Sequence, residues 1–502
     1  MYMLLISALM TFCWTMAPAQ EQEAPMSVTL FASPENPAIK TAPSYRIPAI
    51  ARCADNTLIA IADYRYQLSD IGGGSGSNTS QIELHYRRST DDGVTWSEEK
   101  ILCERNDNDL NDWRWAMGDA AIVANAESNE VMVICACGAV GNGASTADRP
   151  IKIAVFRSFD AGKTWDEGQE VTDQIYGLYG GEATAIFITS GSLCQSKQIK
   201  VNCDGYYRIY AAHPIRTKTR GNSTSVIYSD DFGRTWHILG SDTEFPPKTV
   251  YEEGKVEEMP DGSVALMVRD DSGANSTEKG KKNFNHFTYT DIENGEGTWS
   301  EAVSGITGMA NACNSTLRMV KAQRVADGKL THVALVALPF HTVNIRDKEN
   351  NYGRKSVGFF FKEIDTEADF STGEALAYGW QRGYQVTDKN SAYTDLCALS
   401  NGLVALLAED NGKQGTGADG NKETEAYDII FYSLPLELIT NGNYTAPTAE
   451  QTSICGPVEE IVNAPHGHRQ LSSIDGKLLA SLSEAPAICI ENNRKFINSK
   501  RK

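Results

Sequence analysis

The sequence predicts an all-β protein whose sheets are arranged as the blades of a β-propeller. Many short runs rich in β-branched residues, such as 151–156 and 263–268, are separated by Gly, Asp and Asn turns, which is the pattern of strands joined by tight turns. Long amphipathic helical stretches are nearly absent, and an octapeptide repeats along the chain. A chain of 502 residues exceeds the roughly 250–300 at which one core stops growing, so we expect a ring of repeated units, each with its own small core.

The repeated octapeptide has the chemistry of a β-hairpin turn. Clean copies span residues 89–96, 158–165 and 229–236, and a degenerate copy with extra residues spans 291–299. Their Asp positions lie 69 residues (91 to 160) and 71 residues (160 to 231) apart, a regular spacing for propeller blades. The Asp accepts N–H groups of its own loop, Gly supplies a positive φ, and Trp packs into the core below. We expect these turns to be structural and not catalytic.

Composition and charge exclude several classes of partner. A formal net charge of −19 argues against nucleic acid, whose binding proteins present basic surfaces, and against an anionic membrane. No run after residue 20 has the ~18 apolar residues of a membrane-spanning helix, so no integral membrane segment is expected. No residue spacing matches a common metal motif, and we expect no metal and no other cofactor. An anionic substrate would need a locally positive pocket.

The N-terminus has features of a secretory signal peptide. An apolar run over residues 4–14 precedes Ala17-Pro18-Ala19, a small-x-small cleavage pattern. The usual Lys or Arg before the run is missing, and a buried N-terminal strand or helix is the alternative. We expect residues 1–19 to be a signal peptide and the protein to be secreted, or periplasmic or at the cell surface if bacterial. Residues 20–440 would form the propeller and 441–502 a C-terminal extension of unknown role.

The octapeptide resembles the Asp-box, or BNR repeat, of the sialidase (neuraminidase) superfamily. Asp-boxes also occur in other propellers, so they indicate the fold more firmly than the function. Together with the motifs below, the resemblance covers roughly residues 42–440 and implies a six-bladed β-propeller with Asp-box turns. It further implies an exo-α-sialidase of the bacterial or trypanosomal type, a glycoside hydrolase that removes terminal sialic acids. Sialylated glycoconjugates are then the expected partners, and we expect a monomer.

Sialic acid makes unusual demands on a binding site. Its anomeric carbon carries a carboxylate, which the planar guanidinium of Arg can bind in bidentate fashion. That carboxylate would repel an Asp or Glu nucleophile, whereas a neutral Tyr avoids the repulsion. A free Tyr has a pKa near 10 and therefore needs an adjacent base such as Glu. Sialidases are known as the Tyr-nucleophile exception among glycosidases.

Two segments before the first Asp-box resemble the beginning of a sialidase site. Tyr45-Arg46-Ile47-Pro48 resembles the RIP motif, which implies that Arg46 is the first of three carboxylate-binding arginines. Family members carry the general acid on a Gly-rich loop about two dozen residues later. Asp70, 24 residues after Arg46 (46 to 70) and before a Gly run, is predicted as that acid, with Asp63 as the competitor. Arg65 is predicted to line the pocket.

Two later segments continue the resemblance in the same order. Gly118-Asp119, before a strand predicted at 120–123, resembles the segment with which relatives contact the N-acetyl or O4 side of the sugar, which implies that Asp119 binds substrate. The stretch 251–270 resembles the one that runs from the activating Glu to the second arginine. The family separation of about sixteen residues selects Glu253 among four nearby glutamates, and the turn at 260–262 would bring it close to Arg269.

The last predicted residues follow further along the chain. Arg354 precedes a predicted strand and is the expected third arginine, with Arg346 as the fallback. Tyr393-Thr394-Asp395-Leu396 resembles the family's Tyr-Ser-Asp-Leu motif, which implies that Tyr393 is the nucleophile. Glu409 ends the next run and takes the place of the carboxylate that braces the first arginine. No clean Asp-box follows Arg354, which is a departure from the family pattern.

The resemblance implies a retaining mechanism. Asp70 would protonate the leaving oxygen while Tyr393 attacks the anomeric carbon and Glu253 takes its proton. Three alternatives stay open: a trans-sialidase that passes the sugar to galactose, a sialic-acid lectin that has lost the chemistry, and a non-catalytic Asp-box receptor. The combination of Tyr, Glu and Asp argues against the lectin, and the arginines argue against the receptor. The aromatic acceptor residues that would identify a trans-sialidase are not located by the sequence.

Overall fold

Six groups of antiparallel strands form the blades of a six-bladed propeller, and the pairing of Tyr45 with Tyr427 joins the first and last blades into one eight-stranded sheet. The computed structural model describes residues 25–35, 43–66, 69–73, 80–202, 205–240, 245–246, 250–270, 281–306, 313–340, 354–416 and 422–448, with short strands between 460 and 497. The predicted all-β class is confirmed, since the few helices described are short. The predicted signal peptide lies outside the described residues.

Blades 1 to 3 come from the first half of the chain, each in inner-to-outer order. Blade 1 has β2 (Ser44–Arg52), β3 (Leu58–Arg65), β4 (Ile82–Ser89) and β5 (Lys100–Ile101). Blade 2 has β6 (Met117–Ala124), β7 (Val131–Cys137), β8 (Lys152–Ser158) and β9 (Gln169–Glu170), with β11 (Gly191–Ser192) parallel to β6. Blade 3 has β10 (Ala183–Ile186), β14 (Ile209–Thr217), β15 (Asn222–Ser229) and β16 (His237–Ile238), with β12 (Cys194–Gln195) beside β14.

Blades 4 to 6 complete the ring. Blade 4 has β17 (Gly254–Glu258), β18 (Val264–Asp270), β19 (Lys281–Asp291) and β20 (Glu296–Trp299), with β21 (Val303–Gly305) beside β19. Blade 5 has β22 (Leu317–Arg324), β23 (Leu330–Pro339), β24 (Val357–Ile364) and β25 (Gln381–Gln385), with β29 (Tyr444–Thr445) beside β22. Blade 6 has β26 (Thr394–Ala398), β27 (Val404–Thr416), β28 (Lys422–Leu434) and β1 (Met26–Phe31).

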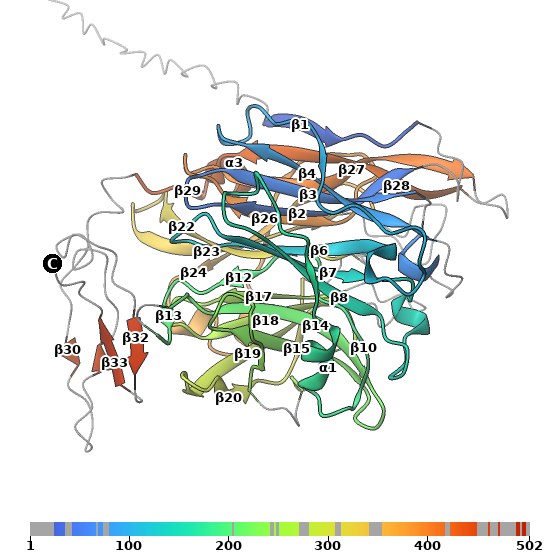
Figure 1. The fold of residues 1–502 in the computed structure, drawn as a ribbon. Coiled ribbons are helices and arrows are strands. Elements are labelled where there is room, and N and C mark those ends of the chain that lie inside the picture. The colour runs from blue at the N-terminus through green and yellow to red at the C-terminus, as the bar shows by residue number, and fades with distance from the viewer. Residues whose placement is uncertain are drawn as a thin grey trace, which may run out of the picture.

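Short helices and tail strands lie outside the blades. The helices are α1 (Thr172–Gly177), α2 (Gly373–Ala377) and α3 (Leu436–Ile439), with 3₁₀ turns η1 (Ile71–Gly73), η2 (Trp113–Trp115), η3 (Asn142–Ala144) and η5 (Glu367–Asp369). In the predicted C-terminal extension, β30 (Glu460–Ile461) pairs with β31 (Gln470–Leu471), and β32 (Ile488–Glu491) with β33 (Arg494–Ile497). β32 also pairs with β13 (Ile199–Lys200), so these strands lie at the side of the propeller (Figure 1).

The hydrophobic core shows that the six blades close into a ring. Six of the apolar clusters each join two successive blades, from blades 1 and 2 around to blades 6 and 1. The last of these packs Phe31, Leu58 and Ala60 against Leu407 and Phe431. The N-terminal β1 also pairs with β28 and completes the last blade. The two ends of the propeller are therefore joined by strand pairing as well as by packing.

The Asp-boxes form the turns between the third and fourth strands of blades 1, 2 and 3. In the first box, Asp91 accepts the backbone N–H of Thr95 at 2.9 Å and the hydroxyl of Ser89 at 2.8 Å. Gly93 has a φ of 89°, and the Trp96 indole donates to its carbonyl at 2.9 Å. The same Asp–Thr and Ser–Asp bonds recur at Asp160 and Asp231. The predicted role of the octapeptide as a hairpin turn is confirmed.

Candidate active site

The predicted site residues come from five of the six blades, mostly from inner strands or their ends. Arg46 lies on β2, Asp119 on β6 and Glu409 on β27, while Glu253 and Tyr393 lie immediately before β17 and β26. Inner strands face the propeller axis, so side chains distant in sequence converge there. The remaining predicted residues lie at strand ends or on adjoining loops: Arg65, Asp70, Arg269 and Arg354.

Tyr393, Glu253 and Arg269 form one hydrogen-bonded group. The Tyr393 hydroxyl donates to Oε2 of Glu253 at 2.8 Å, and the Arg269 guanidinium donates to the same oxygen at 2.6 Å and to the Tyr393 hydroxyl at 2.9 Å. The turn after β17 places Glu253 opposite Arg269, whose N–H donates to the Glu253 carbonyl at 2.9 Å. The expected closeness of Glu253 and Arg269 is therefore present, with Tyr393 added from blade 6.

The environment of Tyr393 is both buried and electropositive. Its side chain is enclosed, with 8% of the residue exposed, and the guanidinium carbons of Arg46 and Arg354 each lie 5.6 Å from its ring centroid. Burial and the neighbouring Glu253 raise the pKa of Tyr393 well above its ordinary value, while Arg269, Arg354 and Arg46 oppose that rise. The surroundings of Tyr393 are thus locally positive in a protein whose net charge is −19.

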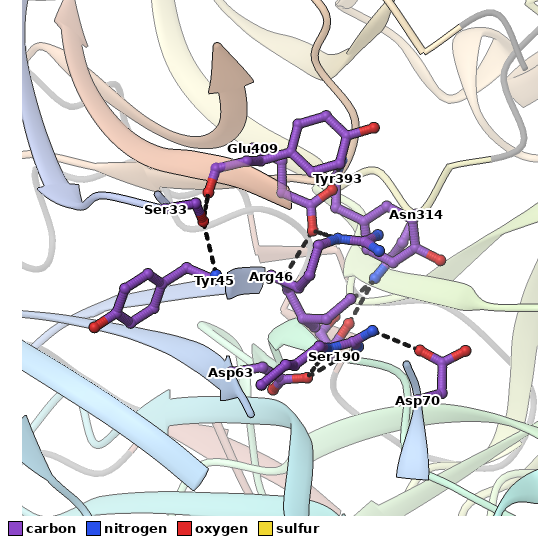
Figure 2. Close-up of polar contacts among 12 residues, drawn as sticks. Ser33, Tyr45, Arg46, Asp63, Asp70, Ser190, Asn314, Tyr393 and Glu409 are labelled. Carbon is purple, nitrogen blue, oxygen red and sulfur yellow. Dashed lines mark hydrogen bonds and ion pairs between the residues drawn. The ribbon is translucent and has the colours of Figure 1, made fainter. Parts of the chain in front are cut away.

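Glu409 fixes both Arg46 and the backbone around Tyr393 (Figure 2). Its Oε1 accepts Nε of Arg46 at 2.6 Å and the N–H of Ile47 at 2.8 Å, and its Oε2 accepts the N–H of Tyr393 at 3.1 Å. Burial works against ionisation of this carboxyl, but the Arg46 charge and these hydrogen bonds hold the pKa of Glu409 below its ordinary value. The structure therefore places Glu409 where the predicted brace for the first arginine should lie.

A second carboxylate group surrounds Arg65. Its guanidinium donates to Oδ1 of Asp70 at 2.7 Å and to Oδ2 of Asp63 at 3.1 Å; both carboxylates are labelled in Figure 2. Asp63 also accepts the N–H of Asp119 at 3.0 Å. Asp63 is fully buried, whereas 72% of the Asp70 side chain is exposed. Of the two candidates for the acid, only Asp70 has a carboxyl that a ligand can reach.

The pKa values of these carboxyls differ according to their surroundings. The Arg65 guanidinium, assisted by Arg46 and Arg354, lowers the pKa of Asp70 below its ordinary value. Burial raises the pKa of Asp63 to about 6 despite the charge of Arg65. Burial and the nearby Asp63 also raise the pKa of Asp119 well above its ordinary value. An anion that neutralises the arginines would therefore make protonation of Asp70 easier.

One local detail differs from the sequence prediction. Gly118 and Asp119 were expected before a strand at 120–123, but β6 begins at Met117 and both residues lie within it, at a bulge. Asp119 there has a φ of 55°, a conformation that Asp tolerates better than most residues. The fallback Arg346 lies outside the described residues. Arg354 does lie just before β24, as expected.

Sequence reasoning missed a layer of polar residues beneath Tyr393 and Glu253. Asp395 is fully buried and accepts the N–H of Ile50 and the hydroxyls of Ser192 and Thr316. The ammonium of buried Lys255 donates to the carbonyl of Ser190, which also accepts Nδ2 of Asn314 at 3.0 Å. A signal was present, because 253, 255 and 257 are charged at alternate positions, so that Lys255 and Glu257 share one face of β17 and Glu253 directly precedes it.

Within the described part of the chain, no group of three or more His, Cys, Asp and Glu side chains is arranged to hold a metal ion. Nor does any helix in the described segments have the length and apolar character needed to cross a membrane.

The fold and the site define a class of protein: a six-bladed Asp-box propeller with three arginines around a Tyr–Glu pair. The family model of the BNR repeat-like domain matches residues 70–323, and the chain belongs to this family within the sialidase superfamily. A sialidase of Paraclostridium sordellii is 23% identical over 436 residues, which is 82% of this chain and 90% of that protein. A sialidase of Bacteroides fragilis (strain YCH46) is 24% identical over 302 residues, which is 57% of this chain and 48% of that protein.

Solved structures of similar fold include both hydrolases and trans-sialidases. The Hadza microbial sialidase Hz136 superimposes with a TM-score of 0.55 at 21% identity, covering 79% of this chain and 66% of that one. The intramolecular trans-sialidase of Ruminococcus gnavus, solved with oseltamivir carboxylate, gives 0.56 at 16% identity, covering 84% and 99%. Trypanosoma rangeli sialidase gives 0.54 at 18% identity, covering 83% and 60%. These likenesses support the fold.

Proposed function

We propose that this protein is an exo-α-sialidase that hydrolyses terminal sialic acids by a retaining mechanism with Tyr393 as the nucleophile. The observation that carries the proposal is the hydrogen bond of 2.8 Å from the Tyr393 hydroxyl to Glu253, within reach of three arginines. A structural tyrosine would need neither a buried carboxylate nor so much positive charge. Sialylated glycoproteins, glycolipids or oligosaccharides are the proposed substrates, and export through residues 1–19 would bring the enzyme to them.

Each step of the proposed reaction uses a described side chain. The sialic acid carboxylate binds among Arg46, Arg269 and Arg354. The Tyr393 oxygen attacks the anomeric carbon as its proton passes to Oε2 of Glu253. The bond to the leaving oxygen breaks, and a protonated Asp70 supplies the proton that this oxygen needs. Water, deprotonated by Asp70, then displaces Tyr393, which recovers its proton from Glu253, so the sugar leaves with its original anomeric configuration.

The raised pKa of Tyr393 makes the contribution of Glu253 necessary. A buried phenol ionises poorly at neutral pH, so its proton must be removed as the new bond forms. Glu253 is the group already hydrogen-bonded to that hydroxyl. The three arginines balance the negative charges that the carboxylate and the base place in the pocket.

Transfer of the sugar to an internal or external acceptor is the second candidate. It is favoured by the likeness to the Ruminococcus gnavus intramolecular trans-sialidase, of which this chain covers 99%. The product distinguishes the reactions. Hydrolysis gives free sialic acid, whereas intramolecular transfer gives the anhydro sugar, which is lighter by one water, and transfer to galactose gives a new glycoside.

The test compares wild type with Tyr393→Phe on a fluorogenic α-sialoside, followed by mass analysis of the released sugar. We expect release of free sialic acid by wild type and a loss of at least about a thousandfold in kcat in the variant, because covalent catalysis is removed. Tyr45→Phe is the matched control, since it also removes a hydrogen-bonded phenol, which donates to Glu99 outside the pocket. Sialoside binding without release by wild type would favour the lectin alternative.

A further inference from the structure

The segment that carries Asp70 is in close contact with a loop of blade 2. Gly72 has a φ of 72°, and a Cβ at this position would clash with the backbone N of Gly141. A Cβ at Gly141 would in turn clash with the carbonyl oxygen of Ile71. Only glycine allows the two backbones to approach so closely, and glycine also accepts the positive φ of position 72. The backbone next to Asp70 thus rests directly on that of Gly141.

Ile71 anchors the same segment from below. Only 4% of this residue is exposed, and it packs with Ile82, Ala116, Ala136 and Ile151. The residue that follows Asp70 is therefore enclosed, while the Asp70 side chain itself is open to solvent. A buried neighbour restricts where the Asp70 carboxyl can point.

The loop that contains Gly141 is hydrogen-bonded to the segment that carries Glu253. The Tyr251 hydroxyl donates to Oδ1 of Asn142 at 3.0 Å, and Tyr251 is two residues before Glu253. Arg216 of β14 donates to the carbonyls of Asn142 and Ser145 at 2.8 and 2.9 Å. The contacts therefore run without a break from Glu253, through Tyr251, Asn142, Gly141 and Ile71, to Asp70.

We propose that Tyr251, Asn142 and Gly141 are positioning residues that set the distance between the general acid Asp70 and the Tyr393–Glu253 pair. We call these three residues the acid bridge. The inference rests on the proposed function, in which Asp70 and Tyr393 act on opposite sides of one glycosidic bond. The acid bridge meets the backbone beside Asp70, so its effect should fall on proton donation and not on substrate charge recognition.

The experiment separates proton donation from the other steps by changing the leaving group. An aryl α-sialoside releases an acidic phenol that departs with little protonation, whereas 3′-sialyllactose releases an alcohol that needs a proton. General acid catalysis contributes typically about 10²–10⁴-fold, and a misplacement of about 1 Å can cost about 10²-fold. We therefore expect Tyr251→Phe and Gly141→Ala to lower kcat on sialyllactose by about tenfold to a hundredfold. On the aryl sialoside, kcat should fall less than about threefold, with KM little changed on both substrates.

Matched controls use the same substitutions elsewhere in the chain. Tyr206→Phe removes a hydroxyl that donates to Glu130 at 2.8 Å, and Gly177→Ala adds a Cβ that meets no atom within 4 Å. Both should leave the ratio of the two substrate rates unchanged. Tyr251→Phe keeps the test available if the Gly141 variant does not fold.

Three results are informative. A selective loss on sialyllactose in the acid-bridge variants, smaller than but parallel to that of Asp70→Asn, supports the proposal. Equal losses on both substrates in the acid-bridge variants, alongside a selective loss in Asp70→Asn, overturn it and leave the proposed function intact. If Asp70→Asn itself shows no selectivity, or wild type releases no sialic acid, the proposed function fails and the acid bridge fails with it.

Discussion

Two buried carboxylates, Glu409 and Asp63, organise the two halves of the site with the same backbone arrangement. Glu409 accepts the N–H of Ile47 at a bulge in β2, and Asp63 accepts the N–H of Asp119 at a bulge in β6. The two bulged residues have φ values of 57° and 55°. Each carboxylate also binds one arginine. Backbone strain of this kind persists only where surrounding contacts enforce it, and it concentrates at functional sites.

The two halves differ in how firmly they hold negative charge. Glu409 accepts three short bonds, at 2.6, 2.8 and 3.1 Å. Asp63 accepts longer bonds, at 3.0, 3.1 and 3.4 Å, and shares Arg65 with Asp70. The pKa of Glu409 is accordingly lowered, and that of Asp63 is raised to about 6. Glu409, which binds Arg46, therefore keeps its negative charge. Asp63, which binds Arg65, changes its charge in the pH range of the proposed chemistry.

Among the changes that test this comparison, neutralising Glu409 has the largest expected effect. Glu409→Gln leaves the charge of buried Arg46 uncompensated, and breaking a buried pair in this way costs about 3–5 kcal/mol. We expect kcat/KM on an aryl sialoside at pH 5 to fall by at least about a hundredfold. The same isosteric change in the other half, Asp63→Asn, should cost less than about fivefold, because Asp63 is already mostly protonated at that pH.

Steady-state kinetics at pH 5, with thermal unfolding to check that both variants fold, measures this difference. Similar losses of kcat/KM in the two variants would show that Glu409 and Asp63 do not differ in charge at this pH, contrary to the comparison above.

A smaller effect is expected in the pH dependence of the free energy of unfolding, to which Asp63 and Glu409 should contribute with opposite signs. The pKa of Asp63 is about 6 in the folded state and near 3.9 when unfolded, so its stabilising contribution is full below about pH 4 and lost as pH rises through 6. The loss is on the order of 2–3 kcal/mol. Glu409 has a lowered folded pKa, so its contribution is present above about pH 4.5 and lost as pH falls.

Urea unfolding of both variants and wild type at pH 4, 5.5 and 7 tests these signs. Relative to wild type, Asp63→Asn should gain stability between pH 4 and 7, while the penalty of Glu409→Gln should shrink as pH falls below about 4.5. If the two differences change in the same direction with pH, the assigned charge states are wrong.

Contacts between residues of one hairpin could be predicted from the sequence. For contacts between blades, the sequence indicated only the order in which the motifs follow one another. Glu253 and Arg269 lie on the two sides of one hairpin, so their spacing and the turn at 260–262 suffice to bring them together. The contact of Tyr393 with Glu253 joins blades 6 and 4 and depends on closure of the whole ring. The order of motifs anticipated it through a family resemblance, but no spacing along the chain specifies the distance.

The backbone bulges could not be predicted from residue type. Ile47 is β-branched, and such residues are genuine outliers at positive φ. Its conformation is held by Glu409, which is 362 residues away. The partners of Asp395 were similarly hidden: the motif 393–396 includes this residue, but its hydroxyl and backbone donors come from other blades. Tertiary donors, and not local sequence, determine both features.

The smallest expected effect is in the second Asp-box, where Asp160→Ala should change the free energy of unfolding without changing the site. Asp160 accepts the N–H and hydroxyl of Thr164 at 2.9 and 2.7 Å in the second Asp-box, in the turn between the two outer strands of blade 2. By analogy with the loss of a helix cap, we expect a cost of about 1 kcal/mol in the free energy of unfolding. The kcat on either sialoside should change less than about twofold. A large fall in kcat in a folded Asp160→Ala variant would mean that the stability of a blade controls the site. The losses of kcat/KM in Glu409→Gln and Asp63→Asn would then not report on local charge.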